Sequence, residues 1–156
     1  MEAASNRRTF ITLMDPVTLQ AVWKTHTDSE FISKDVEATL ETMTEDAFVL
    51  NVPTGVGALC KDKVRSFYKD IFIGTFPDDW DGELKNRVVG ESALVDEIRQ
   101  TFTHTRQMDW ILPGIRPTGR KIEVGIVAVV LFRDDKICGE RIYWDHASAL
   151  QQASLL

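Results

Sequence analysis

Hydrophobic residues in the first half of the chain recur at the spacing of an α-helix. The strongest such pattern is a set at i, i+3, i+4, i+7 and i+8, formed by Val64, Phe67, Tyr68, Ile71 and Phe72. This pattern predicts a helix with one buried face. Gly74 comes shortly after it and suits a helix end, because glycine adopts the left-handed conformation of a C-terminal cap without strain.

Two further helices are expected before this one. The pair Asp15-Pro16 predicts a helix start, because aspartate can cap free amides and proline fits the first helical position. Asp35 predicts the cap of the second helix. The apolar face of the first helix consists of Leu19, Val22, Trp23 and His26, and that of the second of Val36, Leu40 and Met43. We expect both helices to lie over an apolar space.

The remaining apolar runs predict strands. The first covers residues 47–52 and ends at Pro53 and a glycine loop, and four more are expected at 83–91, 94–105, 121–133 and 136–145. The pair Asp134-Asp135 predicts a tight turn that joins the last two strands as a hairpin. Residues 107–120 form a long connection with two prolines and two glycines, and a short helix at 146–153 ends the chain.

Helices followed by strands that are joined by hairpins predict an α+β fold, with an antiparallel sheet covered on one face. In strand 121–133 both alternating sets of side chains are apolar, which predicts burial on both faces. One face would meet the helices. The other would meet a second subunit, so we expect a homodimer.

Length and composition fit one domain. The 156 residues are 44% hydrophobic, which is enough for one core, and we divide them into an N-terminal arm at 1–14 and a single domain at 15–156. The net charge of −6 argues against binding to nucleic acid or to an anionic membrane. No signal peptide or membrane-spanning run is expected, and Cys60 and Cys138 form no disulfide framework. These features predict a cytoplasmic protein.

Sequence motifs exclude several kinds of chemistry. The three histidines lack the H-x-H and H-E-x-x-H spacings of metal sites, and the glycines form neither a Walker loop nor a dinucleotide fingerprint. A nucleophile elbow of the form G-x-S-x-G is also absent from the sequence. The kind of chemistry that remains is general acid–base catalysis in an apolar pocket.

The last predicted strand carries the first candidates. Strand alternation places Arg141, Tyr143 and Asp145 on one face, which we expect to point into the pocket. Partial burial would raise the pKa of Asp145 and make it a proton carrier, while Tyr143 would donate to an enolate oxygen and Arg141 would hold a carbonyl or an anion. Alternatively, Asp145 caps the helix that follows it, Tyr143 packs in the core and Arg141 pairs with an acidic neighbour.

Histidines and strand carboxylates supply the other candidates. His104, in strand 94–105, is the second choice as an acid/base or polarising group, and His26 is the third. A histidine that is only hydrogen-bonded at a strand end is the alternative for His104. In the pair Asp96-Glu97 one carboxylate faces each way, so one of the two is expected to point at the pocket.

Three segments resemble a known family. FTHT at 102–105, MDWILPGIRPTGR at 108–120 and IYWDHASALQQ at 142–152 resemble blocks of SnoaL-like polyketide cyclases, a branch of the nuclear transport factor two-like superfamily. The resemblance implies a cone-shaped α+β barrel, in which a strongly bent antiparallel sheet packs against N-terminal helices around an apolar pocket. It also implies frequent dimers, no cofactor, and an aspartate near the end of the last strand as the acid/base for aldol ring closure. By position this residue is Asp145.

The leading hypothesis is therefore a cofactor-independent cyclase or isomerase of secondary metabolism, with an apolar, carbonyl-bearing substrate such as a polyketide- or terpenoid-like intermediate. Its catalytic candidates are Asp145, His104 and Tyr143. Substrate-binding candidates are Trp23, His26, Phe48, Tyr68, Phe102, Trp110 and Arg141. Hydrolysis or dehydration on the same fold, as in epoxide hydrolases, is one alternative. A non-catalytic ligand-binding or dimerisation module is another, and it predicts a pocket without convergent polar groups.

Overall fold

The computed structural model describes residues 14–156, so the expected N-terminal arm lies outside them except for Met14. The helical elements are α1 (Pro16–Asp28), α2 (Val36–Glu41), α3 (Lys61–Phe67) and α4 (His146–Gln152), with π-helical turns η1 (Ser29–Ser33) and η2 (Tyr68–Phe72). The strands are β1 (Met43–Asn51), β2 (Val56–Leu59), β3 (Asp81–Val89), β4 (Ala93–Thr103), β5 (Lys121–Arg133) and β6 (Lys136–Trp144).

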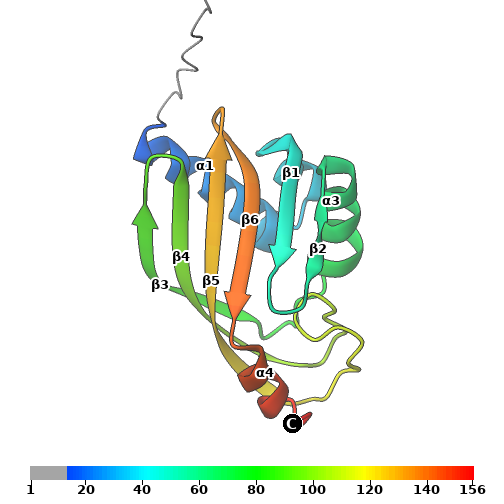
Figure 1. Cartoon of the computed structure of the whole chain (residues 1–156). Helices are drawn as coiled ribbons and strands as arrows, with labels where there is room; N and C mark the ends of the chain where they lie inside the picture. Colours follow the sequence, from blue (N-terminus) through cyan, green and yellow to red (C-terminus); the bar gives the residue numbers. More distant parts are fainter. Residues whose placement is uncertain (1–13) are drawn as a thin grey trace, which may run out of the picture.

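The strands form one bent sheet that the helices cover on one face (Figure 1). The strand order is β2-β1-β6-β5-β4-β3, in which β1 and β6 run parallel and the other neighbours run antiparallel. The predicted α+β class is confirmed. The sheet is open, because β2 and β3 lie at its two edges.

Local sequence signals explain several element boundaries. Asp35 caps α2, since its Oδ1 accepts a hydrogen bond from the amide of Ala38 at 3.0 Å. The turn between β5 and β6 has positive φ at both Asp134 (52°) and Asp135 (61°), which matches the twist of a two-residue hairpin. Asp15 precedes α1 as expected, but its side chain makes no capping hydrogen bond.

The core lies between the helices and the concave face of the sheet. One face of β5 is buried along its whole length, through Ile122, Val124, Ile126, Ala128, Val130 and Phe132. On the other face of β5, Val127 is 37% exposed. Within one chain, β5 is therefore buried on one face only, contrary to the expectation of burial on both. The second subunit that would cover the other face remains a prediction.

Three segments differ from the sequence-based expectation. Met43, expected on the apolar face of the second helix, begins strand β1, because α2 ends at Glu41. Residues 56–59, predicted as part of a loop, form the edge strand β2, because Gly57 lies against the backbone of Val49 too closely for a side chain. In the connection between β4 and β5, the side chains of Met108, Trp110, Ile111 and Leu112 are all buried. This connection therefore closes one end of the core.

Two further expectations concern the chain as a whole. Cys60 and Cys138 are both free thiols, in agreement with the absence of a disulfide framework. Among residues 14–156, every helix is too short or too polar to cross a membrane.

Candidate active site

A cavity of about 210 Å³ lies between the helices and the concave face of the sheet. Its walls are mostly aromatic and come from α1, η1, η2 and two loops; they consist of Trp23, Phe31, Tyr68, Phe72, Trp80 and Trp110. Ile126, Ala128 and Ile142 line it from β5 and β6. Leu84, 50% exposed on β3, marks the open side.

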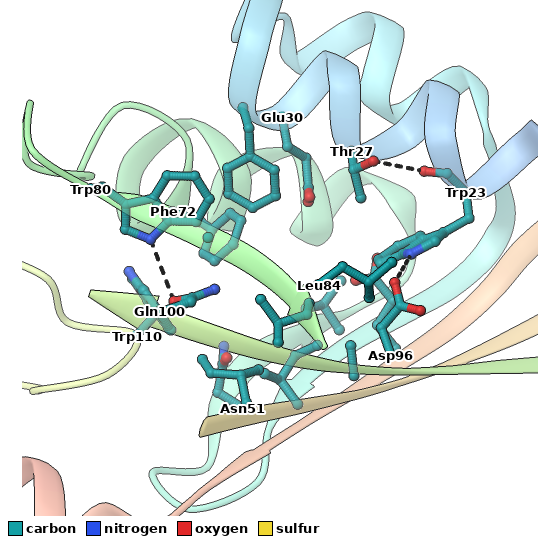
Figure 2. Close-up of a pocket in the computed structure, with 18 of the residues that line it drawn as sticks. Trp23, Thr27, Glu30, Asn51, Phe72, Trp80, Leu84, Asp96, Gln100 and Trp110 are labelled. Atoms are coloured by element: carbon teal, nitrogen blue, oxygen red, sulfur yellow. Dashed lines mark hydrogen bonds between the residues drawn. The ribbon is translucent and has the colours of Figure 1, made fainter. Parts of the chain in front are cut away.

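Three carboxylates enter this apolar space. Glu30 comes from η1, Asp96 from β4 and Glu140 from β6, and each is at most 4% exposed. Figure 2 shows Glu30 pointing from the helical side into the cavity, and Asp96 lying beneath Trp23. Burying a carboxylate is costly unless it has partners, so the partners of each one define its chemistry.

Glu30 and Glu140 share one imidazole. His26 Nε2 lies 3.2 Å from Glu30 Oε1 and 3.1 Å from Glu140 Oε1. The hydroxyl of Tyr68 donates to Glu140 Oε1 at 2.9 Å and lies 3.2 Å from His26 Nε2. Glu30, Glu140 and Tyr68 line the cavity, and the fully buried His26 lies behind them. We call these four residues the acid cluster.

The orientation of the His26 ring is fixed from its other side. Thr42 donates its hydroxyl hydrogen to the carbonyl of Thr39 at 2.6 Å, so its oxygen accepts from His26 Nδ1–H at 2.7 Å. Nδ1 is therefore protonated. A second proton on Nε2 makes the ring an imidazolium that faces both carboxylates.

The charges of the acid cluster shift its pKa values. Burial alone would lower the pKa of His26, but the nearby Glu30 and Glu140 carboxylates raise it to about 10. Burial raises the pKa of Glu30, and it raises the pKa of Tyr68 well above its usual value. A protonated Glu30 leaves the His26 imidazolium opposite the Glu140 carboxylate, which makes the cluster neutral in its apolar surroundings.

Asp96 has different partners. Its Oδ1 and Oδ2 accept from the Arg87 guanidinium, both at 2.7 Å, and Oδ2 also accepts from Trp23 Nε1 at 2.8 Å. A bidentate arginine stabilises the carboxylate form. Asp96 is thus a fixed negative group beside the cavity, and it is the inward member of the pair Asp96-Glu97, since Glu97 is exposed.

The acid cluster also contains the atoms best placed for a metal ion. Among residues 14–156, the side chains of His26, Glu30 and Glu140 bring one nitrogen and two carboxylate oxygens within 4.8 Å of one another. Such a donor set suits divalent transition metals. In the present geometry the imidazole contacts both carboxylates directly.

The predicted inward face of β6 is wrong. Leu131 of β5 pairs with Gly139 and Phe132 pairs with Ile137, so Cys138 forms a β-bulge. The bulge precedes the predicted residues, so the alternation from Glu140 to Trp144 is regular, but its inward set is the other one. Glu140 and Ile142 line the cavity, while Tyr143 is 39% exposed on the opposite face.

The three catalytic candidates do not meet in the cavity. Asp145 is exposed and caps α4, since its Oδ1 accepts from the amide of Ser148 at 3.1 Å. His104 is fully buried outside the cavity lining, where its Nδ1 accepts from the amide of Thr118 at 3.3 Å and burial lowers its pKa. These positions, with that of Tyr143, place the predicted catalytic group away from the cavity.

The predicted binding residues divide into two sets. Trp23, Tyr68 and Trp110 line the cavity, and His26 lies directly behind it. Phe102 is buried in the core, outside the cavity lining. Phe48 and Arg141 lie outside the cavity lining, where the guanidinium carbon of Arg141 is 5.1 Å from the centroid of the Phe48 ring. Arg141 faces away from the cavity because it alternates with the inward Glu140 and Ile142.

Sequence reasoning missed Glu30 and Glu140. Glu140 was assigned to the outward face of β6, because the alternate set that contains Asp145 was expected to point into the pocket. Glu30 follows His26 by four residues, which is the spacing of one helical face, so its pairing with His26 carried a detectable signal. The π-helical turn η1 continues α1 and preserves this proximity.

The bent sheet with helices over one face defines a nuclear transport factor two-like fold, here with a buried acidic cavity. An NTF2-like protein from Burkholderia xenovorans LB400 matches with a TM-score of 0.68 and 12% identity, over 90% of this chain and 98% of that chain. The family of SnoaL-like polyketide cyclases matches residues 21–153. The chain therefore belongs to the SnoaL-like polyketide cyclase family.

Other solved structures share the fold. A putative SnoaL-like polyketide cyclase from Jannaschia sp. CCS1 matches with a TM-score of 0.73 and 16% identity, over 90% of this chain and 94% of that chain. A putative ketosteroid isomerase from Kribbella flavida DSM 17836 matches with a TM-score of 0.59 and 11% identity, over 83% and 78%. A comparison with curated proteins found no match. Family membership supports an enzyme of this superfamily.

Proposed function

We propose that the chain is a cofactor-independent cyclase or isomerase that moves protons on an apolar, carbonyl-bearing small molecule, such as a polyketide- or terpenoid-like intermediate. The observation that carries the proposal is that two buried carboxylates, Glu30 and Glu140, line one apolar cavity and share the imidazole of His26. Membership in the SnoaL-like family supports this class of reaction.

The two carboxylates have complementary roles in this proposal. Glu140 takes a proton from the carbon next to the substrate carbonyl. Glu30, whose pKa is raised by burial, gives its proton to the carbonyl oxygen, so that an enol forms. In an isomerisation the proton returns to another carbon. In a cyclisation the enol carbon attacks the carbon of a second carbonyl of the same molecule and forms a carbon–carbon bond, while the enol proton returns to Glu30 and the proton held by Glu140 passes to the oxygen of the second carbonyl.

His26 and Tyr68 position the pair. The His26 imidazolium lies 3.1 Å from Glu140, whose charge it offsets, and 3.2 Å from Glu30. The Tyr68 hydroxyl donates to Glu140 Oε1 and fixes that oxygen at the cavity wall. Aromatic walls exclude water around the reacting carbon, which strengthens each of these electrostatic interactions.

Hydrolysis or dehydration remains the second candidate, because Asp96 also lines the cavity. Its bidentate contact with Arg87 keeps a carboxylate available to orient a water molecule or a leaving group. Product mass separates the two reactions, since isomerisation or aldol cyclisation conserves mass and hydration or dehydration changes it by one water. The convergence of three carboxylates on the cavity favours either enzyme over a non-catalytic carrier.

Deuterium exchange tests the proposed proton transfer without knowledge of the natural substrate. 2-Tetralone, a two-ring ketone, is incubated with the protein in D₂O near neutral pH, and deuterium uptake beside the carbonyl is followed by mass spectrometry. We expect deuterium uptake to be faster with the wild-type protein than in buffer alone. In Glu140→Gln the protein-catalysed rate of uptake should be about 10²–10⁴-fold lower than in the wild type. Glu30→Gln should lose a similar factor.

The control is Glu97→Gln, which makes the same chemical change at an exposed position of β4. This variant should exchange at the wild-type rate. Tryptophan fluorescence, from the indoles that line the cavity, reports whether each variant binds 2-tetralone. A wild type that binds the ketone without accelerating exchange, or a fully active Glu140→Gln, would contradict the proposal.

A further inference from the structure

We propose that Gln100 selects the substrate at the end of the cavity away from Glu140, by donating a hydrogen bond from its side-chain amide nitrogen to a second carbonyl oxygen of the substrate. This role rests on the proposed function, in which Glu30 and Glu140 act on the first carbonyl. It adds the class of substrate, a compound with carbonyl groups at opposite ends of a skeleton of one or two rings.

Gln100 reaches the cavity from β4. Its side chain belongs to the cavity lining, and the residue is 6% exposed. On the neighbouring strand β5, Gln100 pairs with Val124, whereas Glu140 pairs with Val130. These two partners are six residues apart on one strand, so Gln100 and Glu140 lie at opposite ends of the cavity.

Trp80 fixes the orientation of the Gln100 amide. The indole Nε1 of Trp80 donates to Gln100 Oε1 at 3.4 Å. Because an indole nitrogen can only donate, the carboxamide oxygen must face Trp80 and the carboxamide nitrogen must face the other way. Figure 2 shows the amide nitrogen of Gln100 on the side turned away from Trp80, where it points into the cavity.

The indole of Trp80 is itself held by its surroundings. It stacks on Phe31, with ring centroids 4.8 Å apart, and contacts Phe76 at 5.1 Å. Gly82, which pairs with Gln100 across β3 and β4, leaves room for it, since a Cβ at Gly82 would lie only 2.8 Å from Cη2 of the indole. The missing side chain at Gly82 thus allows Trp80 to lie beside Gln100.

The amide nitrogen of Gln100 is accessible to a ligand. Within residues 14–156, Nε2 of Gln100 donates to no acceptor, and the one bond of this side chain is the one that its oxygen accepts. In the same part of the chain, the unpaired side-chain atoms that are closed to water are Asn51 Oδ1, His104 Nε2 and Trp110 Nε1. Gln100 Nε2 is not one of these closed atoms. It is therefore an open donor on the wall of the cavity.

A carbonyl oxygen is the partner that suits this nitrogen. Nε2 only donates, so the ligand must supply a lone pair. Trp80, Ile98 and Ile126 line the cavity around Gln100, and their side chains offer no acceptor. A ligand hydroxyl that accepted from Nε2 would leave its own hydrogen without a partner among these side chains, which a carbonyl oxygen avoids.

The two carbonyls of such a substrate would meet opposite walls of the cavity. Figure 2 shows the Glu30 carboxylate entering from the helical side, and the Gln100 amide entering the same space from the sheet. The cavity of about 210 Å³ exceeds the ~150 Å³ that holds benzene in an engineered core. A fused two-ring diketone is therefore of suitable size.

The test compares two ketones that differ by one carbonyl group, trans-decalin-2,6-dione and trans-2-decalone. Titration calorimetry measures the affinity of the wild type and of Gln100→Met for each ketone. We expect the ratio of affinities, diketone over monoketone, to be about three- to tenfold higher in the wild type than in Gln100→Met. The hydration of the ligands and the symmetry of the diketone cancel, because both proteins are measured with the same two ketones.

Thr27→Val is the matched control. Thr27 also lines the cavity, but its hydroxyl donates to the carbonyl of Trp23 at 3.1 Å, so this variant should keep the wild-type ratio. Circular dichroism and the retained affinity for 2-decalone report folding. Gln100→Asn keeps an amide but withdraws it by one methylene group, so it should also lower the ratio. This second variant decides the question if Gln100→Met fails to fold.

A wild type that binds the diketone no more tightly than the monoketone would overturn the proposal. A ratio in the folded Gln100 variants equal to that of the wild type would overturn it as well. Deuterium exchange of 2-tetralone separates this result from the proposed function. Exchange that depends on Glu140, with a ratio that does not depend on Gln100, rejects the role of Gln100 alone. A ratio that depends on Gln100, without exchange, supports that role and rejects the proton transfer.

Discussion

His26 on α1 and Glu140 on β6 meet inside the protein, with Nε2 and Oε1 3.1 Å apart and both side chains at most 5% exposed. The contact joins the helical layer to the centre of the sheet. Glu30 approaches the same nitrogen at 3.2 Å. Removing the His26 charge from this contact leaves the Glu140 carboxylate buried without a compensating charge.

Replacing His26 should therefore destabilise the protein strongly. We expect His26→Gln to lower the free energy of unfolding by about 3–5 kcal/mol, because the buried Glu140 carboxylate loses its counter-charge. Urea unfolding followed by circular dichroism measures the change. Lys24→Ala on the same helix removes the exposed pair with Asp28 and should have a much smaller effect. If both variants lowered the free energy of unfolding equally, the buried contact would contribute no more to stability than the exposed pair.

The same contact predicts how stability depends on pH. The pKa of His26 is raised from 6.5 to about 10, so between these values the folded protein binds more protons than the unfolded chain. The contribution of His26 is complete below pH 6.5 and is lost as the pH rises through about 10. The raised pKa of Glu30 acts in the same direction.

Urea unfolding at a series of pH values from 6.5 to 10 checks this prediction. The free energy of unfolding of the wild type should fall across the range, and the difference between the wild type and His26→Gln should shrink with it. A difference that stays constant or grows toward pH 10 would be inconsistent with an imidazolium at this position.

Arg87 should stabilise the protein through Asp96. Arg87→Met removes both hydrogen bonds to the buried Asp96 carboxylate and leaves it with Trp23 Nε1. We expect a loss of about 2 kcal/mol, less than for a fully buried pair because the Arg87 side chain is 26% exposed. Arg99→Met, which affects exposed partners on the neighbouring strands, is the control for urea unfolding. A loss no larger than that of Arg99→Met would contradict the role of this pair.

Asp145 should matter for the stability of α4. Its Oδ1 accepts a hydrogen bond from the amide of Ser148, so Asp145→Ala should cost about 1 kcal/mol and Asp145→Asn much less. Thermal unfolding of both variants provides the measurement. Equal losses for alanine and asparagine would mean that the charge of Asp145, and not its capping oxygen, is what the fold uses.

The sequence predicted the elements better than the direction in which their side chains point. The strands at 121–133 and 136–145 were expected nearly as observed, because long apolar runs and the Asp134-Asp135 turn are local signals. The two alternating sets of β6 were predicted correctly, but the wrong set was taken as inward, because Asp145 was expected to enter the pocket and instead caps α4. Alternation alone does not say which of two sets faces the core.

The candidate site was predicted only in part. Trp23, Tyr68 and Trp110 were named from their place on helices and in the long connection, and all three line the cavity. The acid cluster joins α1, η1, η2 and β6. Glu140 was missed because it was placed on the outward face of β6, and Glu30 because its four-residue spacing from His26 was not interpreted as a pair. Only the structure shows that the two glutamates are buried around one histidine.

The most direct test of the proposed mechanism compares Glu140→Gln with Asp145→Asn in the exchange of 2-tetralone protons for deuterium. Each variant replaces a carboxylate by a neutral amide, Glu140 within β6 and Asp145 directly after it. Of the two residues, only Glu140 lines the cavity. The account predicts a loss of about 10²–10⁴-fold in Glu140→Gln and the wild-type rate in Asp145→Asn. The reverse pattern, with Glu140→Gln active and Asp145→Asn inactive, would contradict it.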